Sequence, residues 1–429
     1  MNNIGLLIKM ARIQQNMKQV SLAKGICSTS YLRKIENNQT IPSEDVLQLL
    51  LERLELDYED LSTEQENDFL ADLYLLYKEA IIDRNKKEVR AKLKNYTTRN
   101  FLFVDESNFF TYNLYLFRLS LITEADVDTV KSLMNALDQM REKFDERQHF
   151  IFNKNCGFYF YLVKDYKLSL SYFESALEFV TNFHLQEWEF ADFYHALSMS
   201  YLSNNHLLNT IEYSTKSLKF YKDNLIFNRA IDCYIVLGIA YKLNSNYKNA
   251  EESFLLAKKI VINFKLSEYT EIINHNLGSL FAIQGQSKIA IDYFKESLKN
   301  SSGDENYLLT IYSIAKEYSK QNDEIMVKQW TDTGLKYIAT IINKDHLSYF
   351  YHFNIYKLIH NKDLEFENTL VTAIDYFERN NEFHYVYKYS ILLGNKYSEI
   401  RKYKNSTLYL QKAISFSYKI KSINYWEDL

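Results

Sequence analysis

The feature that most constrains the fold is a repeat with a period of 40 residues in the middle of the chain. Segments 236–257 and 276–297 carry the same kinds of residue at matching positions. The matched pairs are Gly238 with Gly278, Tyr241 with Phe281, Ala250 with Ala290, and Phe254 with Phe294. Self-similarity at this period is typical of stacked structural repeats. The small residues suit places where two helices approach closely, and the aromatic residues fill gaps between helices.

The composition predicts that these repeats are helical. The 429 residues include one proline and nine glycines, and 47% of them are apolar. A chain of this length and composition supports a large core and more than one structural unit. Helix breakers are rare and no runs of alternating β-branched residues occur, so we expect an all-α protein.

The two segments resemble the tetratricopeptide repeat. Each has Leu-Gly, an aromatic residue three positions after the glycine, and then a small residue and an aromatic residue on a second helix. The small-residue position recurs at 157, 198, 238, 278, 315 and 394. Armadillo and HEAT repeats share the period, but the spacing of Gly, Ala and aromatic residues favours the tetratricopeptide. The resemblance implies a right-handed superhelix with a concave inner surface.

The N-terminal 40 residues differ from the rest in charge. They contain six Lys or Arg and one acidic residue, which gives +5, whereas the whole chain carries −4 and the remainder therefore −9. Phosphate contacts from basic side chains supply most of the non-specific affinity for DNA. This distribution predicts that only the head of the molecule meets nucleic acid.

The same head reads as four short helices. We expect them at 3–16, 18–24 and 29–36, with a fourth that opens at Pro42-Ser43-Glu44. Ser28 is a suitable N-cap for the third helix. The segment 17–36 resembles the lambda-repressor-type helix-turn-helix, which implies a salt bridge between Arg12 and Glu36 and a DNA-reading third helix. A helix-turn-helix without DNA activity is the alternative reading.

We therefore predict three parts: a helix-turn-helix domain at 1–55, an acidic linker at 56–66 and tetratricopeptide-like repeats at 67–429, clearest between 150 and 300. Helix pairs without repeat landmarks are expected at 67–82 with 85–97, and at 107–121 with 125–143. A recognition helix presents its start and its exposed face to DNA. The predicted DNA-binding residues are Gln19, Ser28, Thr29, Ser30, Arg33, Lys34 and Asn37.

The first helix of each repeat is expected to line the concave surface. Counting from the small residue of each repeat gives the positions that face the groove. The predicted peptide-binding residues are Asn155, Tyr161, Asp192, His195, Asn228, Arg229, Asp232, His275 and Asn276. Asn155 and Asn276 are expected to clamp a peptide backbone, because an amide side chain both donates and accepts hydrogen bonds.

Motifs for catalysis or cofactors are absent from the sequence. It contains no phosphate-binding glycine loop, no dinucleotide fingerprint, no His-Glu-x-x-His and no Gly-x-Ser-x-Gly. Three scattered cysteines show neither a disulfide framework nor zinc spacing. Lys9 and Arg12 interrupt any N-terminal apolar run, and no stretch is long enough to span a membrane. We expect a cytoplasmic protein that is not an enzyme and needs no metal or cofactor.

A lambda-repressor-type head joined to a long repeat body resembles the RRNPP family of peptide-responsive regulators of Gram-positive bacteria, most closely its NprR and PlcR branch. The resemblance implies a quorum-sensing transcriptional regulator. Its partners would be a short, secreted and re-imported signalling peptide in the groove, promoter DNA with an inverted repeat at the head, and a second copy in a homodimer or higher oligomer. The alternative is a protein-interaction regulator whose repeats sequester a response-regulator or phosphorelay protein.

Overall fold

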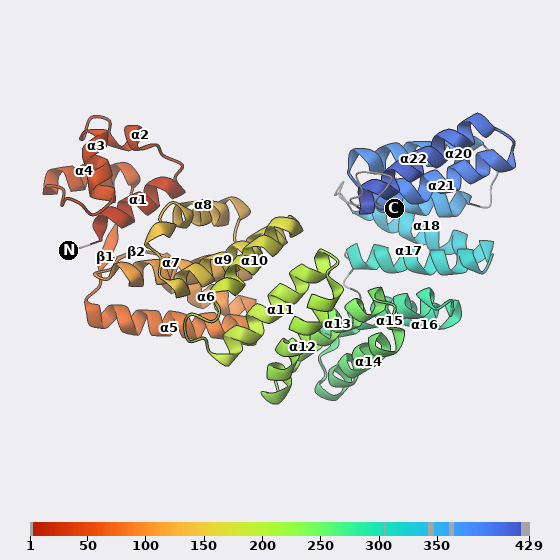
Figure 1. Cartoon of the computed structure of the whole chain (residues 1–429), viewed down its shortest axis with the longest axis horizontal. Coiled ribbons are helices and arrows are strands. Elements are labelled where there is room, and N and C mark those ends of the chain that lie inside the picture. Colours follow the sequence, from red (N-terminus) through yellow and green to blue (C-terminus); the bar gives the residue numbers. More distant parts are fainter. Residues whose placement is uncertain are drawn as a thin grey trace. The chain divides into compact units, whose positions relative to one another are not determined.

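Helices and two short strands make up the computed structural model of the chain. It describes residues 3–299, 301, 303, 305–341, 347–359 and 364–421. The chain forms two compact units, Met1–Asn246 and Tyr247–Leu429. Each unit is considered by itself below. Within each unit, successive helices pack side by side in antiparallel pairs (Figure 1).

The head consists of four helices whose bounds agree with the sequence prediction. They are α1 Ile4–Gln14, α2 Gln19–Ala23, α3 Thr29–Glu36 and α4 Glu44–Leu54. The Oγ atom of Ser28 accepts a hydrogen bond from the backbone N–H of Tyr31, which caps α3 as expected. At Gly5 an added Cβ would lie 1.9 Å from the carbonyl oxygen of Ile35. Only glycine therefore lets α1 cross α3 this closely.

The segment between head and repeats differs from the predicted linker. Within 56–66 lies strand β1 Tyr58–Asp60, which pairs in parallel with β2 Asn100–Leu102, and α5 already begins at Thr63. Each strand has three residues, which is too short for alternating hydrophobicity to reveal. The segment attaches the head to the body through backbone hydrogen bonds instead of leaving it on a free tether.

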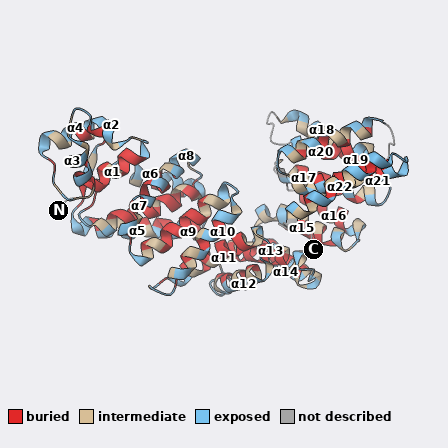
Figure 2. Ribbon diagram, turned by 45° about the horizontal axis from the view of Figure 1, so that its top comes forward, coloured by how far each residue is buried: buried red, intermediate tan, exposed pale blue. Residues whose placement is uncertain are grey.

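The remaining helices of the first unit follow β1 in sequence. They are α5 Thr63–Ile82, α6 Lys86–Thr97, α7 Glu106–Ile122, α8 Val127–Asp138, the 3-10 helix Arg141–Lys143, α9 Glu146–Leu162, α10 Tyr166–Phe179, α11 Glu187–Ser203, α12 Leu207–Asp223 and α13 Phe227–Leu243. The helices α5 to α8 confirm the two pairs predicted without repeat landmarks. Buried residues concentrate where these helices face one another (Figure 2).

The second unit continues the series of helix pairs. Its elements are α14 Tyr247–Phe264, the 3-10 helix Ser267–Tyr269, α15 Thr270–Ile283, α16 Ser287–Leu298, α17 Glu305–Lys320, α18 Glu324–Thr340, α19 Leu347–Leu358, α20 Leu364–Arg379, α21 Phe383–Glu399 and α22 Tyr403–Lys421. Across the described residues of both units, no helix is long and apolar enough to cross a membrane.

The small residues of the repeat sit at helix crossings, as the sequence predicted. A Cβ added to Gly157 would lie 2.8 Å from the ring of Phe173, and one at Gly278 would lie 2.7 Å from the ring of Phe294. At Gly394 the neighbour is Leu410, again at 2.8 Å. Each distance is shorter than a side-chain contact tolerates, so the second helix of the pair packs directly on glycine.

Candidate functional site

Helix α3 presents a polar and basic surface. Ser28, Ser30, Arg33 and Lys34 are exposed, and Thr29 and Asn37 are partly buried, so these predicted DNA-contact residues lie at the start and along one side of α3. Beneath that surface Leu32 and Ile35 are buried in the head core. The fold therefore leaves the polar side of α3 available for a partner.

Two other polar residues of the head serve the domain itself. Arg12 Nε lies 2.6 Å from Glu36 Oε1, and both side chains are buried, as the helix-turn-helix resemblance implied. The Nε2 of Gln19 donates to Glu36 Oε2 at 2.7 Å. Gln19 is thus held by Glu36 at the start of α2, and a phosphate contact from its amide must compete with that hydrogen bond.

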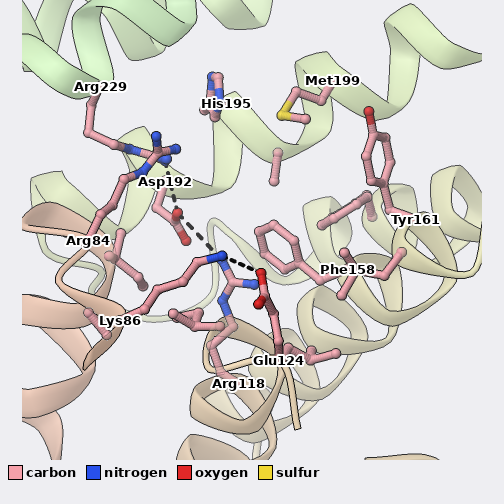
Figure 3. A pocket seen from close by; sticks show the side chains of 17 residues that line it. Arg84, Lys86, Arg118, Glu124, Phe158, Tyr161, Asp192, His195, Met199 and Arg229 are labelled. Atoms are coloured by element: carbon pink, nitrogen blue, oxygen red, sulfur yellow. Dashed lines mark hydrogen bonds and ion pairs between the residues drawn. The ribbon is translucent and has the colours of Figure 1, made fainter. Parts of the chain in front are cut away.

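The first unit contains a pocket of about 430 Å³ between α5, α7, α9 and α11 (Figure 3). Four of the predicted peptide-binding residues line it: Tyr161, Asp192, His195 and Arg229. Apolar side chains form one wall, among them Phe158, Leu162 and Met199. Ligand pockets commonly combine such an apolar wall with a few convergent polar groups.

Positive charge exceeds negative charge around this pocket. The cationic lining residues are Arg84, Lys86, Arg118 and Arg229, whereas the carboxylates are Glu124 and Asp192. Lys86 and Glu124 form an ion pair at the edge. Three guanidinium groups remain against the carboxylates of Asp192 and of Asp232, which pairs with Arg84, so the interior keeps a net attraction for a carboxylate or another anion.

Asp192 is the centre of a buried charge cluster. Arg229 Nη2 lies 3.1 Å, Lys154 Nζ 3.6 Å and Arg118 Nη2 3.8 Å from its carboxylate oxygens. Burial raises the pKa of Asp192, but the three cations outweigh burial and hold that pKa below its ordinary value. Burial lowers the pKa of Lys154 and of Arg118, and Asp192 opposes that effect in both. Asp192 therefore stays ionised in the folded state.

The cluster also joins helices from separate parts of the first unit. Lys154 Nζ of α9 donates to Tyr77 Oη of α5 at 2.7 Å, and the guanidinium of Arg118 lies 3.3 Å from the ring centroid of Phe158. Burial lowers the pKa of His195 far below its ordinary value, and Arg229 and Arg84 add to that effect. His195 therefore faces the pocket as a neutral ring.

Three predicted residues of α13 meet the corner between α5 and α6. Asn228 Nδ2 donates to the carbonyl oxygen of Ile82 at 3.0 Å, and Arg84 Nη2 lies 2.6 Å from Asp232 Oδ2. Arg229 contacts the same Asp232 at 3.7 Å. This corner closes one side of the pocket, since Arg84 itself lines it. A ligand that uses Asn228 or Asp232 must displace these contacts.

The structure corrects the expectation for Asn155. Its side chain is fully buried, and its Nδ2 donates to the carbonyl oxygen of Leu114 at 2.9 Å. Asn155 therefore joins α9 to α7, and it does not line the pocket. The repeat count placed Asn155 on the inward side of α9, and in the structure α7 covers its side chain.

The two predicted residues near 275 lie in the second unit on α15. His275 Nδ1 lies 2.8 Å from Thr310 Oγ1, and Asn276 Nδ2 donates to the carbonyl oxygen of Ile272 within its own helix. The predicted peptide-binding residues, from Asn155 to Asn276, therefore fall in both units. Within each unit the residues are placed as described, and their use by one peptide stays a prediction.

Sequence reasoning missed the pocket residues Arg84, Lys86 and Arg118, together with the buried Lys154–Tyr77 contact. The first three belong to α5, α6, α7 and their connections, which carry no repeat landmarks. Groove-facing positions were counted from the small residue of each repeat, and these helices have no such residue from which to count. The hydrogen bond of Lys154 to Tyr77 joins residues 77 positions apart, so no local pattern indicates it.

Comparison with known proteins places these features in context. Residues 8–61 match a family model described as Helix-turn-helix. Transcriptional activator NprA of Geobacillus stearothermophilus is 29% identical over 406 residues, which cover 92% of this chain and 98% of that protein. The apo form of the quorum sensor NprR from B. thuringiensis has the same fold, with a TM-score of 0.69 over 82% of this chain and 99% of NprR at 17% identity.

The chain is similar to regulators of the RRNPP family in its helix-turn-helix head and in the fold of its stacked helix pairs. A second solved structure, that of NprR in complex with its cognate peptide NprX, matches with a TM-score of 0.57 and 17% identity, and covers 81% of this chain and 99% of that one. At this identity the match supports the fold alone. The architecture seen here is a helix-turn-helix head followed by stacked helix pairs.

Proposed function

We propose that this chain is a cytoplasmic transcriptional regulator of the RRNPP family that binds promoter DNA through α3 and a short signalling peptide at the pocket of the first unit. The observation that carries the proposal is the presence of both surfaces in one compact unit. The exposed polar side of α3 and the pocket around Asp192 are joined through β1–β2 and through the packing of α1 on α8. The similarity to an activator over nearly the full length supports this reading.

The pocket suits a peptide with an apolar side chain next to a carboxylate. The apolar wall of Phe158, Leu162 and Met199 would take the side chain, and Arg118 and Arg229 would attract the carboxylate. A volume of about 430 Å³ holds one or two side chains and not a whole peptide. The rest of the peptide would extend along the inner helices of the first unit.

On DNA we propose that two copies bind an inverted repeat. One small head buries too little surface for tight, specific binding, and two-fold symmetric dimers match palindromic operators. Light scattering of the full chain with and without DNA tests this part. A monomer at micromolar concentration in both conditions would contradict it.

The peptide site is tested by calorimetry with a synthetic peptide taken from a small secreted protein encoded beside this gene. Lys86→Met removes a cation from the pocket rim, and Lys87→Met is its matched control because Lys87 is exposed and does not line the pocket. We expect Lys86→Met to weaken binding several-fold and Lys87→Met to leave it unchanged. Equal affinities in both variants would place the peptide elsewhere.

The DNA part is tested by a gel shift on the segment upstream of the gene. A specific shift that changes with peptide supports the proposed regulator. Absence of both peptide binding and a DNA shift would favour the alternative, in which the repeats sequester a response-regulator or phosphorelay protein.

A further inference from the structure

Three tyrosines and a histidine surround one lysine in the second unit. Lys388 Nζ of α21 donates to Tyr312 Oη of α17 at 2.8 Å and to Tyr356 Oη of α19 at 3.2 Å. The same ammonium lies 5.1 Å from the ring centroid of Tyr389, whose Oη lies 2.6 Å from Nδ1 of His352. We call these five residues the lysine–tyrosine cluster. It joins the first helices of three consecutive pairs.

The cluster contains a cation without a carboxylate. Among the described residues, none of the hydrogen bonds or ion pairs of Lys388 involves Asp or Glu. Burial lowers the pKa of Lys388 to about 8, and the nearby cation Lys316 of α17 lowers it further. A partly buried ammonium that lacks a counter-charge is unfavourable, and such cations in proteins are usually paired.

The cluster also has more hydrogen-bond donors than acceptors. Lys388 carries three N–H protons, and each of the three tyrosines carries one O–H proton. Burial raises the pKa of Tyr356 to about 12 and raises those of Tyr312 and Tyr389, so the phenols keep their protons near neutral pH. The internal acceptors are the three phenol oxygens and one nitrogen of His352, whose other nitrogen carries a further proton. Two of the three Lys388 protons are taken by Tyr312 and Tyr356, and the third has no partner among the described residues.

His352 does not supply the missing negative charge. Burial lowers the pKa of His352 to about 3, and Lys388 adds to that effect, so the imidazole is neutral. Its ring packs between Tyr312, at 4.8 Å between centroids, and Phe377, at 5.0 Å. The neutral imidazole is hydrogen-bonded through Nδ1 to the hydroxyl of Tyr389 and leaves the positive charge of Lys388 unbalanced.

We propose that the lysine–tyrosine cluster is a binding site for a carboxylate group. A carboxylate oxygen can accept the remaining Lys388 proton, and the single negative charge of the carboxylate balances the ammonium. Lys316, one turn after Tyr312 on α17, adds long-range attraction. A phosphate dianion fits less well, because it carries two negative charges and the cluster itself contains one cation. Lys388 is only partly buried, and two of its N–H protons are used within the cluster, so the third remains for a ligand.

This site does not depend on the proposed peptide pocket. The pocket belongs to the first unit, whereas every residue of the cluster belongs to the second. The helices α17, α19 and α21 are first helices of their pairs, the position that lines the inner surface in this kind of repeat. A free carboxylic acid and an acidic side chain of a bound segment present the same group, so the experiment separates the two sources.

The test uses the full chain and isothermal titration with capped hexaglutamate, with capped hexaglutamine as the neutral control and acetate as the free carboxylate. Three variants are compared: Lys388→Met, Tyr356→Phe and Lys328→Met. Lys328 is an exposed lysine of α18 and serves as the matched control. Tyr356→Phe removes only one oxygen, so it keeps the test valid if Lys388→Met unfolds the unit.

We expect hexaglutamate to bind the wild type and the Lys328→Met variant with the same affinity. Its affinity for Lys388→Met and for Tyr356→Phe should be lower by about tenfold or more. Hexaglutamine should bind none of these proteins. The pocket in the first unit also attracts anions. For this reason, only the difference in affinity between the wild type and Lys388→Met is evidence for binding at the lysine–tyrosine cluster. Acetate binding that needs Lys388, without peptide binding, would assign the site to a free acid. Affinity unchanged in both cluster variants, or no binding of either carboxylate, would overturn the proposal.

Discussion

Asp192 shows how a single buried residue limits what a pocket side chain can do. It balances Arg118, Lys154 and Arg229, and its removal leaves buried cations without a partner. We predict that Asp192→Asn lowers the free energy of unfolding by about 3–5 kcal/mol, the usual effect of breaking a buried ion pair from one side. Urea denaturation followed by circular dichroism measures it.

Two further variants control this prediction. Asp223→Asn removes an exposed carboxylate at the end of α12 and should change the stability little. Lys154→Met removes one cation and leaves Asp192 with the two guanidinium groups, so its effect should be smaller than that of Asp192→Asn. If Asp192→Asn unfolds at the same urea concentration as the wild type, the cluster is not what holds these helices together.

His352 makes the stability of the second unit depend on pH. Its pKa is about 3 in the folded state, because of burial and then Lys388, against an ordinary value of 6.5. As pH falls below 6.5, His352 becomes protonated in the unfolded chain but stays neutral in the folded chain. The free energy of unfolding therefore falls between pH 6.5 and about 3. The slope from one such group is at most ~1.4 kcal/mol per pH unit.

We therefore predict that His352→Gln loses less stability than the wild type between pH 6.5 and 5, where most carboxylates are still ionised. Glutamine keeps an acceptor for the Tyr389 hydroxyl but cannot be protonated. The exposed His384→Gln is the matched control and should keep the wild-type slope. Parallel pH profiles for His352→Gln and the wild type would contradict the prediction.

At the scale of elements, α3 carries the prediction for DNA. Arg33 is exposed on its polar side, so Arg33→Ala should cost about 1–3 kcal/mol of operator affinity and reduce the preference for the operator over other sequences. Lys34→Ala should weaken binding to all sequences alike and lower the salt dependence, as loss of one phosphate contact does. Fluorescence anisotropy at several salt concentrations separates the two. Operator affinity that Arg33→Ala leaves unchanged, in a folded head, would refute the assignment of α3.

The sequence was sufficient to predict most elements, because helix signals are local. The cap at Ser28 and the bounds of α3 follow from residues within a few positions of one another. The glycines at 157, 278 and 394 revealed the helix crossings for the same reason. Strands β1 and β2 were not predicted, since their pairing joins three-residue segments about 40 positions apart and leaves no periodic pattern.

The candidate site was predictable only in part. Tyr161, Asp192, His195 and Arg229 come from helices with a recognisable repeat position, and they do line one pocket. Asn155 has the right position but meets Leu114 of α7, and the repeat pattern says nothing about what covers it. The corner contact of Arg84 with Asp232 joins residues 148 positions apart, so it too required the structure.

On the scale of the whole first unit, the head is held by the same helices that form the pocket. Asn3 Nδ2 donates to the carbonyl oxygens of Phe103 and Val104 at 3.3 and 2.9 Å, directly after β2. Lys9 Nζ donates to the carbonyl oxygen of Gln139 after α8 at 3.3 Å. The buried carboxylate of Glu66 on α5 accepts from the backbone N–H of Val104, which fixes that segment to α5.

This arrangement gives a route from ligand to DNA. Helices α5 and α7 supply Ala80, Ile81 and Arg118 to the pocket, and they also support the segment that Asn3 binds. A peptide that changes the position of α5 or α7 therefore changes the position of the head. Such coupling between two sites is typically worth about 1–3 kcal/mol, and it is reciprocal.

The last prediction separates binding from coupling. The double variant Asn3→Ala, Lys9→Ala removes three side-chain hydrogen bonds between head and body and leaves α3 and the pocket lining unchanged. We expect peptide affinity by calorimetry, and operator affinity without peptide, to change less than twofold. The change in operator affinity caused by peptide should become smaller, because the head then follows α5 and α7 only through β1–β2 and the packing of α1 on α8. Reciprocity supplies an internal control, since operator DNA must then lose the same part of its effect on peptide affinity. A double variant that keeps the full peptide effect would show that β1–β2 and the packing of α1 on α8 transmit the signal, or that the signal passes between two copies of the chain.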